Sequence, residues 1–169
     1  IGSMQSIDAG ILGAVYESLL ALHPQIDDAT WTVTLSTKEG HARKATGSYY
    51  TPIYLVERLL DSTLEPVITK AIRGKSQSEQ ERALLALRIC DPSCGSGYFL
   101  VAAARRLAMR LSRIRSGNME SPPDVVQIAL REVVGQCLYG VDINPMSVEL
   151  CKVALWMLVL EPRNPLPFL

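Results

Sequence analysis

One short segment constrains the fold of this chain more than any other: residues 91–97, with the sequence DPSCGSG. It follows an apolar run, Arg88 to Cys90, that we predict to be a β-strand, and it leads into a long amphipathic segment. Two glycines between a strand and a helix let a ligand approach the backbone without meeting a Cβ atom. Free N–H groups at the helix start donate hydrogen bonds to a phosphate or to the carboxylate of an amino acid. The segment therefore predicts a cofactor-binding turn.

A second strand and an acidic residue narrow the choice of cofactor. Residues 137–141 are predicted to be a strand. Asp142, directly after it, is placed to accept hydrogen bonds from both ribose hydroxyls of a nucleoside. Ile143 beside it could cover the face of the adenine. Asp142 lies more than twice as far from Gly97 as the roughly 20 positions typical of a dinucleotide fold. Leu100 replaces the third glycine of that fingerprint, and no GxxxxGK[ST] phosphate loop is present. An adenosine-bearing amino acid is favoured over NAD, a flavin or a nucleoside triphosphate.

Helices are predicted around these two strands. Thr51 is expected to cap a helix whose first residue is Pro52. Because two helices separate the two strands, the strands are expected to be parallel neighbours in an open α/β sheet. A half-buried strand at 31–35 and a polar loop at 36–45 are predicted near the N-terminus. Apolar periodicity with proline and glycine stops predicts helices at 5–22, from 52, at 62–72, 79–87, 97–117, about 122–134 and 146–160.

Composition excludes several classes of protein. The 169 residues, 48% of them apolar, suffice for one globular unit, and 17 basic residues balance 17 acidic ones. This balance gives no overall electrostatic attraction to nucleic acid or an anionic membrane. The four cysteines and two histidines lack metal-ligand spacing, so we expect no metal and free, reduced thiols. With no signal peptide or membrane span in the sequence, a soluble cytoplasmic protein is expected.

Three motifs in order carry a family resemblance: TGSYYTP at 46–52, DPSCGSGYFL at 91–100 and YGVDINP at 139–145. Together they resemble successive motifs of adenine-specific DNA methyltransferases. In particular they resemble the methyltransferase part of large restriction-modification polypeptides, in which one chain carries nuclease, methyltransferase and target-recognition functions. The resemblance covers roughly residues 44–169. It implies a partial Rossmann-like class I methyltransferase sheet, rich in helices, with S-adenosylmethionine as cofactor.

The resemblance also implies roles for individual residues. Tyr50 and Thr51 are expected at the methionine end of the cofactor. Asp91 is expected to hold the methionine ammonium, directly or through water, while Asp142 binds the ribose and Ile143 packs on the adenine. The backbone at Pro92, Cys94, Gly95 and Gly97 is expected to line the pocket.

The chain departs from the family at the catalytic motif. The family holds the flipped adenine with an asparagine or aspartate followed by Pro-Pro and an aromatic residue, and residues 164–167, NPLP, do not match it. We therefore expect an inactive front part of the enzyme, with double-stranded DNA bound by parts outside this chain. Residues 1–3 resemble an expression-tag remnant. We expect residues 4–46 to form a helical extension with a short strand and a loop, and residues 47–169 to be the front part of the methyltransferase domain. An uncovered strand edge makes a homodimer a further expectation.

Simpler interpretations stand beside these. Asp91 would otherwise cap the turn, and Asp142 would otherwise begin the next helix. Cys94 is expected to be a small turn residue rather than a nucleophile, because no histidine or other base is near it in sequence. Arg105, Arg106 and Arg110 are candidate DNA contacts, although a solvated helix face explains them as well.

The sequence is also compatible with two rival functions. A related enzyme that methylates protein glutamine or RNA would share the cofactor pocket and differ mainly in its substrate-binding parts. A module that only senses the cofactor or supports assembly would bind S-adenosylmethionine, but the methylation rate of a partner would not depend on Asp142.

Overall fold

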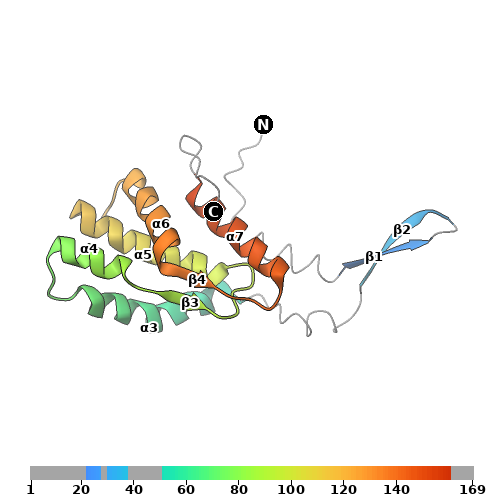
Figure 1. Ribbon diagram of the computed structural model, residues 1–169, viewed down its shortest axis with the longest axis horizontal. Helices are drawn as coiled ribbons and strands as arrows, with labels where there is room; N and C mark the ends of the chain where they lie inside the picture. The colour runs from blue at the N-terminus through green and yellow to red at the C-terminus, as the bar shows by residue number, and fades with distance from the viewer. Residues whose placement is uncertain (1–21, 28–29, 38–50, 161–169) are drawn as a thin grey trace.

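The structure is a computed structural model that describes residues 22–27, 30–37 and 51–160. Strands β1 and β2 form an antiparallel hairpin, and β3 and β4 form a parallel pair. Figure 1 shows the hairpin apart from the helices, which gather around the β3–β4 pair. The elements in order are β1 (Leu22–Asp27), β2 (Thr32–Thr37), α3 (Ile53–Ile72), α4 (Gln77–Leu85), β3 (Ile89–Asp91), α5 (Tyr98–Ser116), α6 (Pro123–Cys137), β4 (Leu138–Gly140) and α7 (Pro145–Val159).

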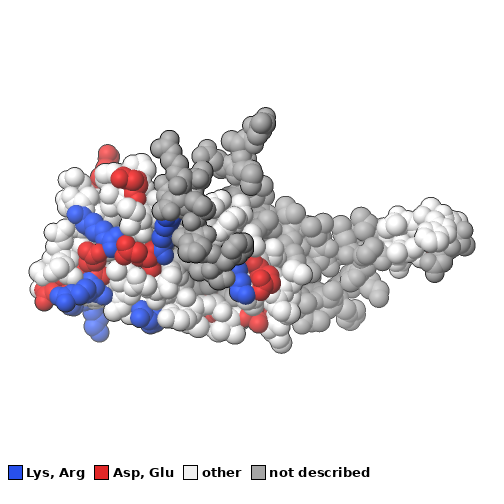
Figure 2. Space-filling view, turned by 45° about the horizontal axis from the view of Figure 1, so that its top comes forward, with Lys and Arg blue, Asp and Glu red and all other residues white. Residues whose placement is uncertain are grey.

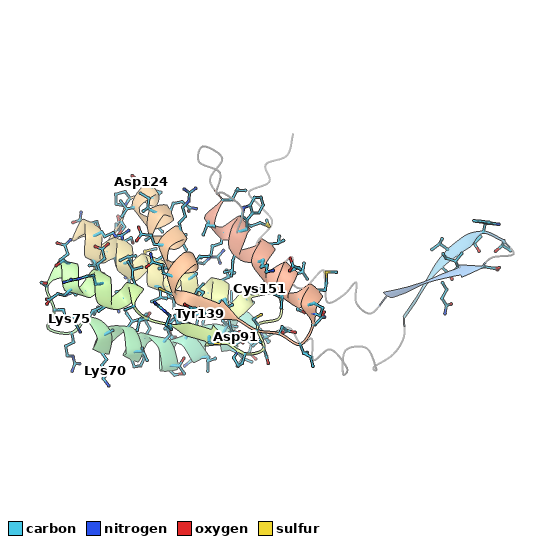
Figure 3. The ribbon with its side chains drawn as sticks, in the orientation of Figure 1. Lys70, Lys75, Asp91, Asp124, Tyr139 and Cys151 are labelled. Atoms are coloured by element: carbon cyan, nitrogen blue, oxygen red, sulfur yellow. The ribbon has the colours of Figure 1, made fainter. Side chains whose placement is uncertain are left out.

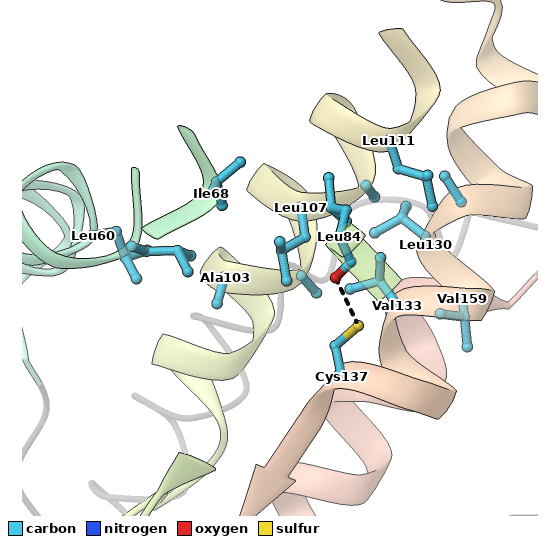
Figure 4. Close-up of a cluster of buried hydrophobic side chains, with 14 of the residues drawn as sticks. Leu60, Ile68, Leu84, Ala103, Leu107, Leu111, Leu130, Val133, Cys137 and Val159 are labelled. Atoms are coloured by element: carbon cyan, nitrogen blue, oxygen red, sulfur yellow. Dashed lines mark hydrogen bonds between the residues drawn. The ribbon is translucent and has the colours of Figure 1, made fainter. Parts of the chain in front are cut away.

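Helix α5 is the centre of the core. It packs against α3, α4, α6 and α7 and touches both strands of the parallel pair. Its buried side chains recur at helical spacing, and Leu107 and Leu111 are fully buried among residues of α3, α4 and α6 (Figure 4). Burying each such leucine contributes about 1.5–3 kcal/mol, so this helix supplies much of the cohesion of the domain.

The parallel pairing of β3 and β4 confirms the sequence-based expectation. Ile89 pairs with Leu138 and Asp91 with Gly140, and helices α5 and α6 form the crossover between the strands. The ladder extends one step further, because the Val141 N–H donates to the Asp91 carbonyl over 2.9 Å. Both strands therefore end at the same edge of the sheet, where their following turns meet.

Only one face of this small sheet is covered by the described residues. Ile89 and Leu138 pack into the core beneath α5. On the opposite face Tyr139 is 50% exposed, and Val141 is 58% exposed (Figure 3 labels Tyr139). Parallel sheets normally bury both faces, so the exposed face is unusual for this class.

The prediction of two separate helical pieces at 52 onward and 62–72 is wrong. A single helix, α3, runs through both and contains Pro66. Its buried residues Val56, Leu60, Leu64 and Ile68 recur every fourth position and face α5 without a break. This continuous apolar stripe offsets the cost of one proline, which is about 3 kcal/mol.

The start of α3 also differs from expectation. Pro52 is the N-cap, and no side chain forms a capping hydrogen bond there, so Thr51 does not cap the helix. At α4 the structure begins two positions earlier than the predicted 79–87, because Ser76 and Glu79 form a capping box. The other predicted helices and strands of residues 88–160 agree with the structure to within one helical turn.

The N-terminal part corrects a second expectation. Residues 22–27 form strand β1, whereas the sequence indicated a helix to residue 22 that His23-Pro24 would stop. Residues 5–21 of that predicted helix lie outside the described residues. The predicted strand at 31–35 is β2, but it starts at Thr32, and Val33 is 65% exposed rather than half-buried. Alternation predicts a strand, but burial requires a surface to cover it.

A glycine in β4 makes the close packing of α5 on the sheet possible. A Cβ atom at Gly140 would lie 2.9 Å from Leu100 Cδ1 and 3.1 Å from Cys94 Sγ. We predict that Gly140→Ala lowers the free energy of unfolding by about 1–3 kcal/mol, the usual cost of overpacking. Denaturant titration followed by circular dichroism measures this change.

Gly135→Ala in α6 is the matched control. A Cβ atom at Gly135 would have no heavy atom within 4 Å, so alanine there is expected to leave stability unchanged or raise it by up to about 1 kcal/mol. Equal destabilisation by the two substitutions would contradict the packing role given to Gly140.

Candidate cofactor site

The turn between β3 and α5 requires glycine at two positions. Gly95 has φ of +53° and Gly97 has φ of +88°, both in the left-handed region that other residues seldom adopt. The Gly97 N–H donates to the Cys94 carbonyl over 2.8 Å, and Gly97 is the N-cap of α5. The predicted strand, glycine turn and helix therefore form in the expected order, with the helix N-terminus at the end of β3.

Hydrogen bonds fasten this turn to the end of the neighbouring strand. The Cys94 N–H donates to the Val141 carbonyl over 2.9 Å. The Gly95 N–H donates to Asp142 Oδ2 over 2.9 Å, across 47 positions of sequence. The structure thus brings the glycine turn and the predicted ribose-binding acid together at one edge of the sheet.

The carboxylate of Asp142 is held in place from both sides. Its Oδ1 accepts the Asn144 N–H over 2.8 Å, while Oδ2 accepts the Gly95 N–H. Each oxygen of a carboxylate has two lone pairs, so both keep capacity for a further donor such as a hydroxyl. Asp142 is half-buried, which leaves it accessible from the edge of the sheet.

Two of the simpler interpretations can be compared with this geometry. Asp91 Oδ1 accepts the Ser93 N–H over 3.0 Å, so Asp91 does cap the turn, and its contact with an ammonium group stays a prediction. Asn144, rather than Asp142, caps α7, because its Oδ1 accepts the Met146 N–H over 3.0 Å. The sequence signal for that cap was the asparagine directly before Pro145, a favoured first helical residue.

A buried cluster of Cys94, Leu100 and Cys151 supports the turn from below. Gly97 lies directly over Cys151, since a Cβ atom at Gly97 would be 2.6 Å from Cys151 Sγ. Gly140 in β4 has no side chain, and this leaves room for the side chain of Leu100 from α5. In dinucleotide folds the third glycine of the turn allows close helix–strand packing. Here Leu100 occupies that position, and Gly140 provides the space instead.

The environment of Cys94 fits the prediction of a small turn residue. Cys94 is 5% exposed, and burial raises the pKa of its thiol above the usual value. Burial likewise raises the pKa of Cys151 to about 12, with the neighbouring Cys94 adding to the effect. A nucleophilic cysteine needs a lowered pKa and an accessible sulfur, and neither thiol has them.

The other predicted cofactor residues differ in their exposure and in their distance along the chain from the glycine turn. Pro92 is exposed beside Asp91, and Ile143 is 87% exposed next to Asp142, with its side chain free to cover a planar group. Thr51 is half-buried ahead of α3. Tyr50 lies outside the described residues.

A groove that the sequence did not reveal borders the site. It is lined by residues of α3, β3 and α5, and Asp91 and Pro92 are part of the lining. Its remaining lining is largely apolar and includes Leu59, Val67 and Phe99. Sequence periodicity could not indicate this groove, because it arises only when α3 packs beside the strand.

The arginines proposed as DNA contacts have acidic partners in the fold. Arg106 forms ion pairs with Glu57 and Asp61 of α3, and Arg110 pairs with Glu65 at 3.2 Å. On the face shown in Figure 2 basic and acidic side chains lie side by side rather than in a basic patch. Arg105 is exposed on the same helix. Contact of these three arginines with DNA stays a prediction.

The fold and the site define a class: a helix-rich chain, consistent with an α/β protein, with a glycine turn and an acid at the ends of adjacent parallel strands. Residues 69–162 match the family described as the MmeI DNA-methyltransferase domain, and the chain belongs to that family. The match includes the glycine turn and Asp142. No solved structure matches the chain.

Curated relatives agree with this family. A putative type II restriction enzyme and methyltransferase of Methanocaldococcus jannaschii is 26% identical over 184 residues, covering 92% of this chain and 14% of the relative. The adenine-specific methyltransferase PglX of Streptomyces coelicolor is 33% identical over 114 residues, covering 68% and 8%. A type II restriction enzyme and methyltransferase of Escherichia coli is 25% identical over 167 residues, covering 94% and 16%. The chain thus spans less than a fifth of each relative.

Gly97 is expected to be the least replaceable residue of the turn. Alanine there would combine an unfavourable positive φ with a 2.6 Å contact to Cys151 Sγ. We predict a loss of about 2–4 kcal/mol in the free energy of unfolding, from both effects. Gly117→Ala is the control, since Gly117 has φ of +67° but open space around it. Its cost, measured by the same denaturant titration, should be only the backbone part, about 1–2 kcal/mol.

The ion pairs of Arg106 are expected to stabilise the contact between α3 and α5. Its side chain is 18% exposed. Removing it leaves the carboxylates of α3 without their partner, and we predict that Arg106→Ala lowers the free energy of unfolding by about 1–2 kcal/mol. Arg58→Ala, at an exposed position of α3, should change it by less than about 0.5 kcal/mol. Thermal and denaturant unfolding distinguish the two, and similar values would rule out a structural role for Arg106.

Proposed function

We propose that this chain is the S-adenosylmethionine-binding front part of a DNA methyltransferase that modifies the N6 amino group of adenine in a restriction-modification system. The observation that carries the proposal is the hydrogen bond from Gly95 to Asp142, which joins the glycine turn to the acid of the next strand. Membership of the MmeI DNA-methyltransferase family supports it. In this view the sheet is the first part of a Rossmann-like class I methyltransferase fold.

The residues present fit such a cofactor. The first turn of α5 offers backbone N–H groups to the methionine carboxylate, and positive-φ glycines let it come close. Asp91 would hold the ammonium group, Asp142 the ribose hydroxyls and Ile143 the adenine face. When bound, the cofactor supplies the methyl group, and the residues of this chain hold its two ends and orient it.

The residues that hold the target adenine are proposed to lie outside this chain. None of its segments matches the family's Asn/Asp-Pro-Pro-aromatic motif. Without hydrogen bonds to the amino group and a stacked aromatic ring, a flipped base has no productive position. We therefore expect no methyl transfer by this chain alone, and we expect double-stranded DNA to bind mainly through other parts of the parent protein.

Adenine in DNA is favoured over the rival substrates by the relatives. One is named an adenine-specific methyltransferase, and two are named restriction enzymes and methyltransferases. Methylation of RNA or of protein glutamine, or a purely cofactor-sensing role, would be supported instead if the full-length parent failed to methylate adenine in double-stranded DNA.

Calorimetric titration of the chain tests the proposed cofactor. We expect binding of S-adenosylmethionine and S-adenosylhomocysteine, with no binding of NAD. Asp142→Asn keeps one oxygen that can accept the Gly95 N–H, but its amide nitrogen cannot accept the Asn144 N–H, and the negative charge is lost. We expect this variant to bind S-adenosylmethionine roughly tenfold to a hundredfold more weakly, because hydrogen bonds to a charged acceptor contribute about that much to affinity.

Glu149→Gln on α7 is the matched control for charge. Glu149 is exposed and pairs with Lys152 away from the turn, so its loss should leave the affinity unchanged. Absence of binding by both the chain and the full-length parent would refute the proposed cofactor. Equal weakening by the two variants would refute the role of Asp142.

A further inference from the structure

A series of three hydrogen bonds links the start of α7 to the glycine turn. The Met146 N–H in the first turn of α7 donates to Asn144 Oδ1 over 3.0 Å. The Asn144 N–H donates to Asp142 Oδ1 over 2.8 Å. The Gly95 N–H donates to the other carboxylate oxygen, Asp142 Oδ2, over 2.9 Å. Asn144 therefore lies between the helix and the carboxylate that is proposed to bind the ribose.

The backbone of Asn144 is held by the residues that follow it. Its φ of −92° and ψ of 110° are extended, which is the region that a following proline, here Pro145, favours. Its carbonyl accepts the Val148 N–H over 3.3 Å, while its side chain accepts the N–H of Met146. Because its carbonyl and its side chain are both bound to α7, the helix sets the direction of the N–H that Asn144 donates to Asp142.

We propose that Asn144 is a positioning residue for the ribose-binding carboxylate of Asp142. Its side chain acts through Asp142 and not by contact with the cofactor. With Oδ1 held by Asn144 and Oδ2 held by Gly95, the plane of the carboxylate is fixed, and the lone pair that remains on each oxygen keeps a constant direction toward a ribose hydroxyl. This role rests on the proposed function, because it requires a ribose at Asp142.

The torsional freedom of a carboxylate explains why this support matters. The terminal torsion of an aspartate side chain has a broad energy minimum, so hydrogen-bond partners decide its orientation. Without the cap, the N–H of residue 144 is less firmly directed at Asp142, and the carboxylate can turn away from the orientation that both hydroxyls need. Binding sites tolerate displacements of only about 0.5 Å. We therefore expect a loss of affinity that depends on the ribose hydroxyls of the ligand.

Titration calorimetry tests this role with S-adenosylhomocysteine and with its analogue that lacks both ribose hydroxyls. We expect Asn144→Ala to weaken binding of S-adenosylhomocysteine roughly tenfold and binding of the analogue by a clearly smaller factor. Asn144→Ser keeps an oxygen that can cap α7 without adding a charge beside Asp142, so it should restore most of the affinity. An equal loss for the two ligands, or no rescue by serine, would overturn the proposal.

Ser76→Ala is the matched control for the loss of a helix cap. Ser76 forms the capping box of α4, and its Oγ donates to Glu79 Oε2 over 2.6 Å. Helix α4 leads into the start of β3, at the opposite end of that strand from the glycine turn (Figure 1). Ser76→Ala should lower the melting temperature about as much as Asn144→Ala but leave the affinity unchanged. Equal weakening of S-adenosylhomocysteine binding by the two variants would show a general effect of stability and refute the positioning role.

Hydrogen exchange of the Gly95 amide gives a second measurement that needs no cofactor. Because Asp142 accepts this N–H, Asn144→Ala should speed its exchange, whereas Ser76→Ala should not. Unchanged exchange in Asn144→Ala would contradict the positioning role. Failure of both the chain and the full-length parent to bind S-adenosylhomocysteine would count against the proposed function, while the exchange measurement still decides whether Asn144 positions Asp142.

Discussion

The hydrogen bond between the Gly95 N–H and Asp142 is the interaction on which the arrangement of the candidate site depends. It joins two turns that follow different strands and lie 47 positions apart in sequence. Because Asp142 also accepts the Asn144 N–H, the same carboxylate fixes the chain just before α7. One side chain therefore sets the relative positions of the glycine turn, the end of β4 and the next helix.

Close packing of α5 on the sheet holds the glycine turn beside the end of β4, where this hydrogen bond forms. Leu100 fits against β4 where Gly140 lacks a side chain, and Cys151 fits beneath Gly97. The buried face of α5 then continues into the core shared with α3, α4 and α6. A site of two short turns is thus held by a core much larger than the site itself, which is a common way to position flexible segments.

Local patterns predicted the parts of the site that are close in sequence. The glycine turn, the strand before it and the helix after it are specified by residues 88–117, because turn chemistry and apolar periodicity act over short distances. The predicted parallel pairing of the two strands was also correct, since a crossover of two helices leaves few alternatives. The prediction of two helical pieces before the turn was wrong, because the buried stripe of α3 continues from Leu60 to Leu64 across the predicted break.

The sequence by itself determined the order of the elements, the turn that needs positive φ at Gly95 and Gly97, and an acid at the end of the next strand. Only the tertiary structure decided which side chains meet: Gly140 with Leu100, Cys94 with Cys151, and Arg106 with the acids of α3. It also decided that residues 22–27 are a strand and that, among the described residues, only one face of the β3–β4 pair is covered. The physical reason is the separation along the sequence over which each interaction acts. Backbone propensity and capping depend on neighbouring residues, whereas packing and ion pairing join residues tens of positions apart.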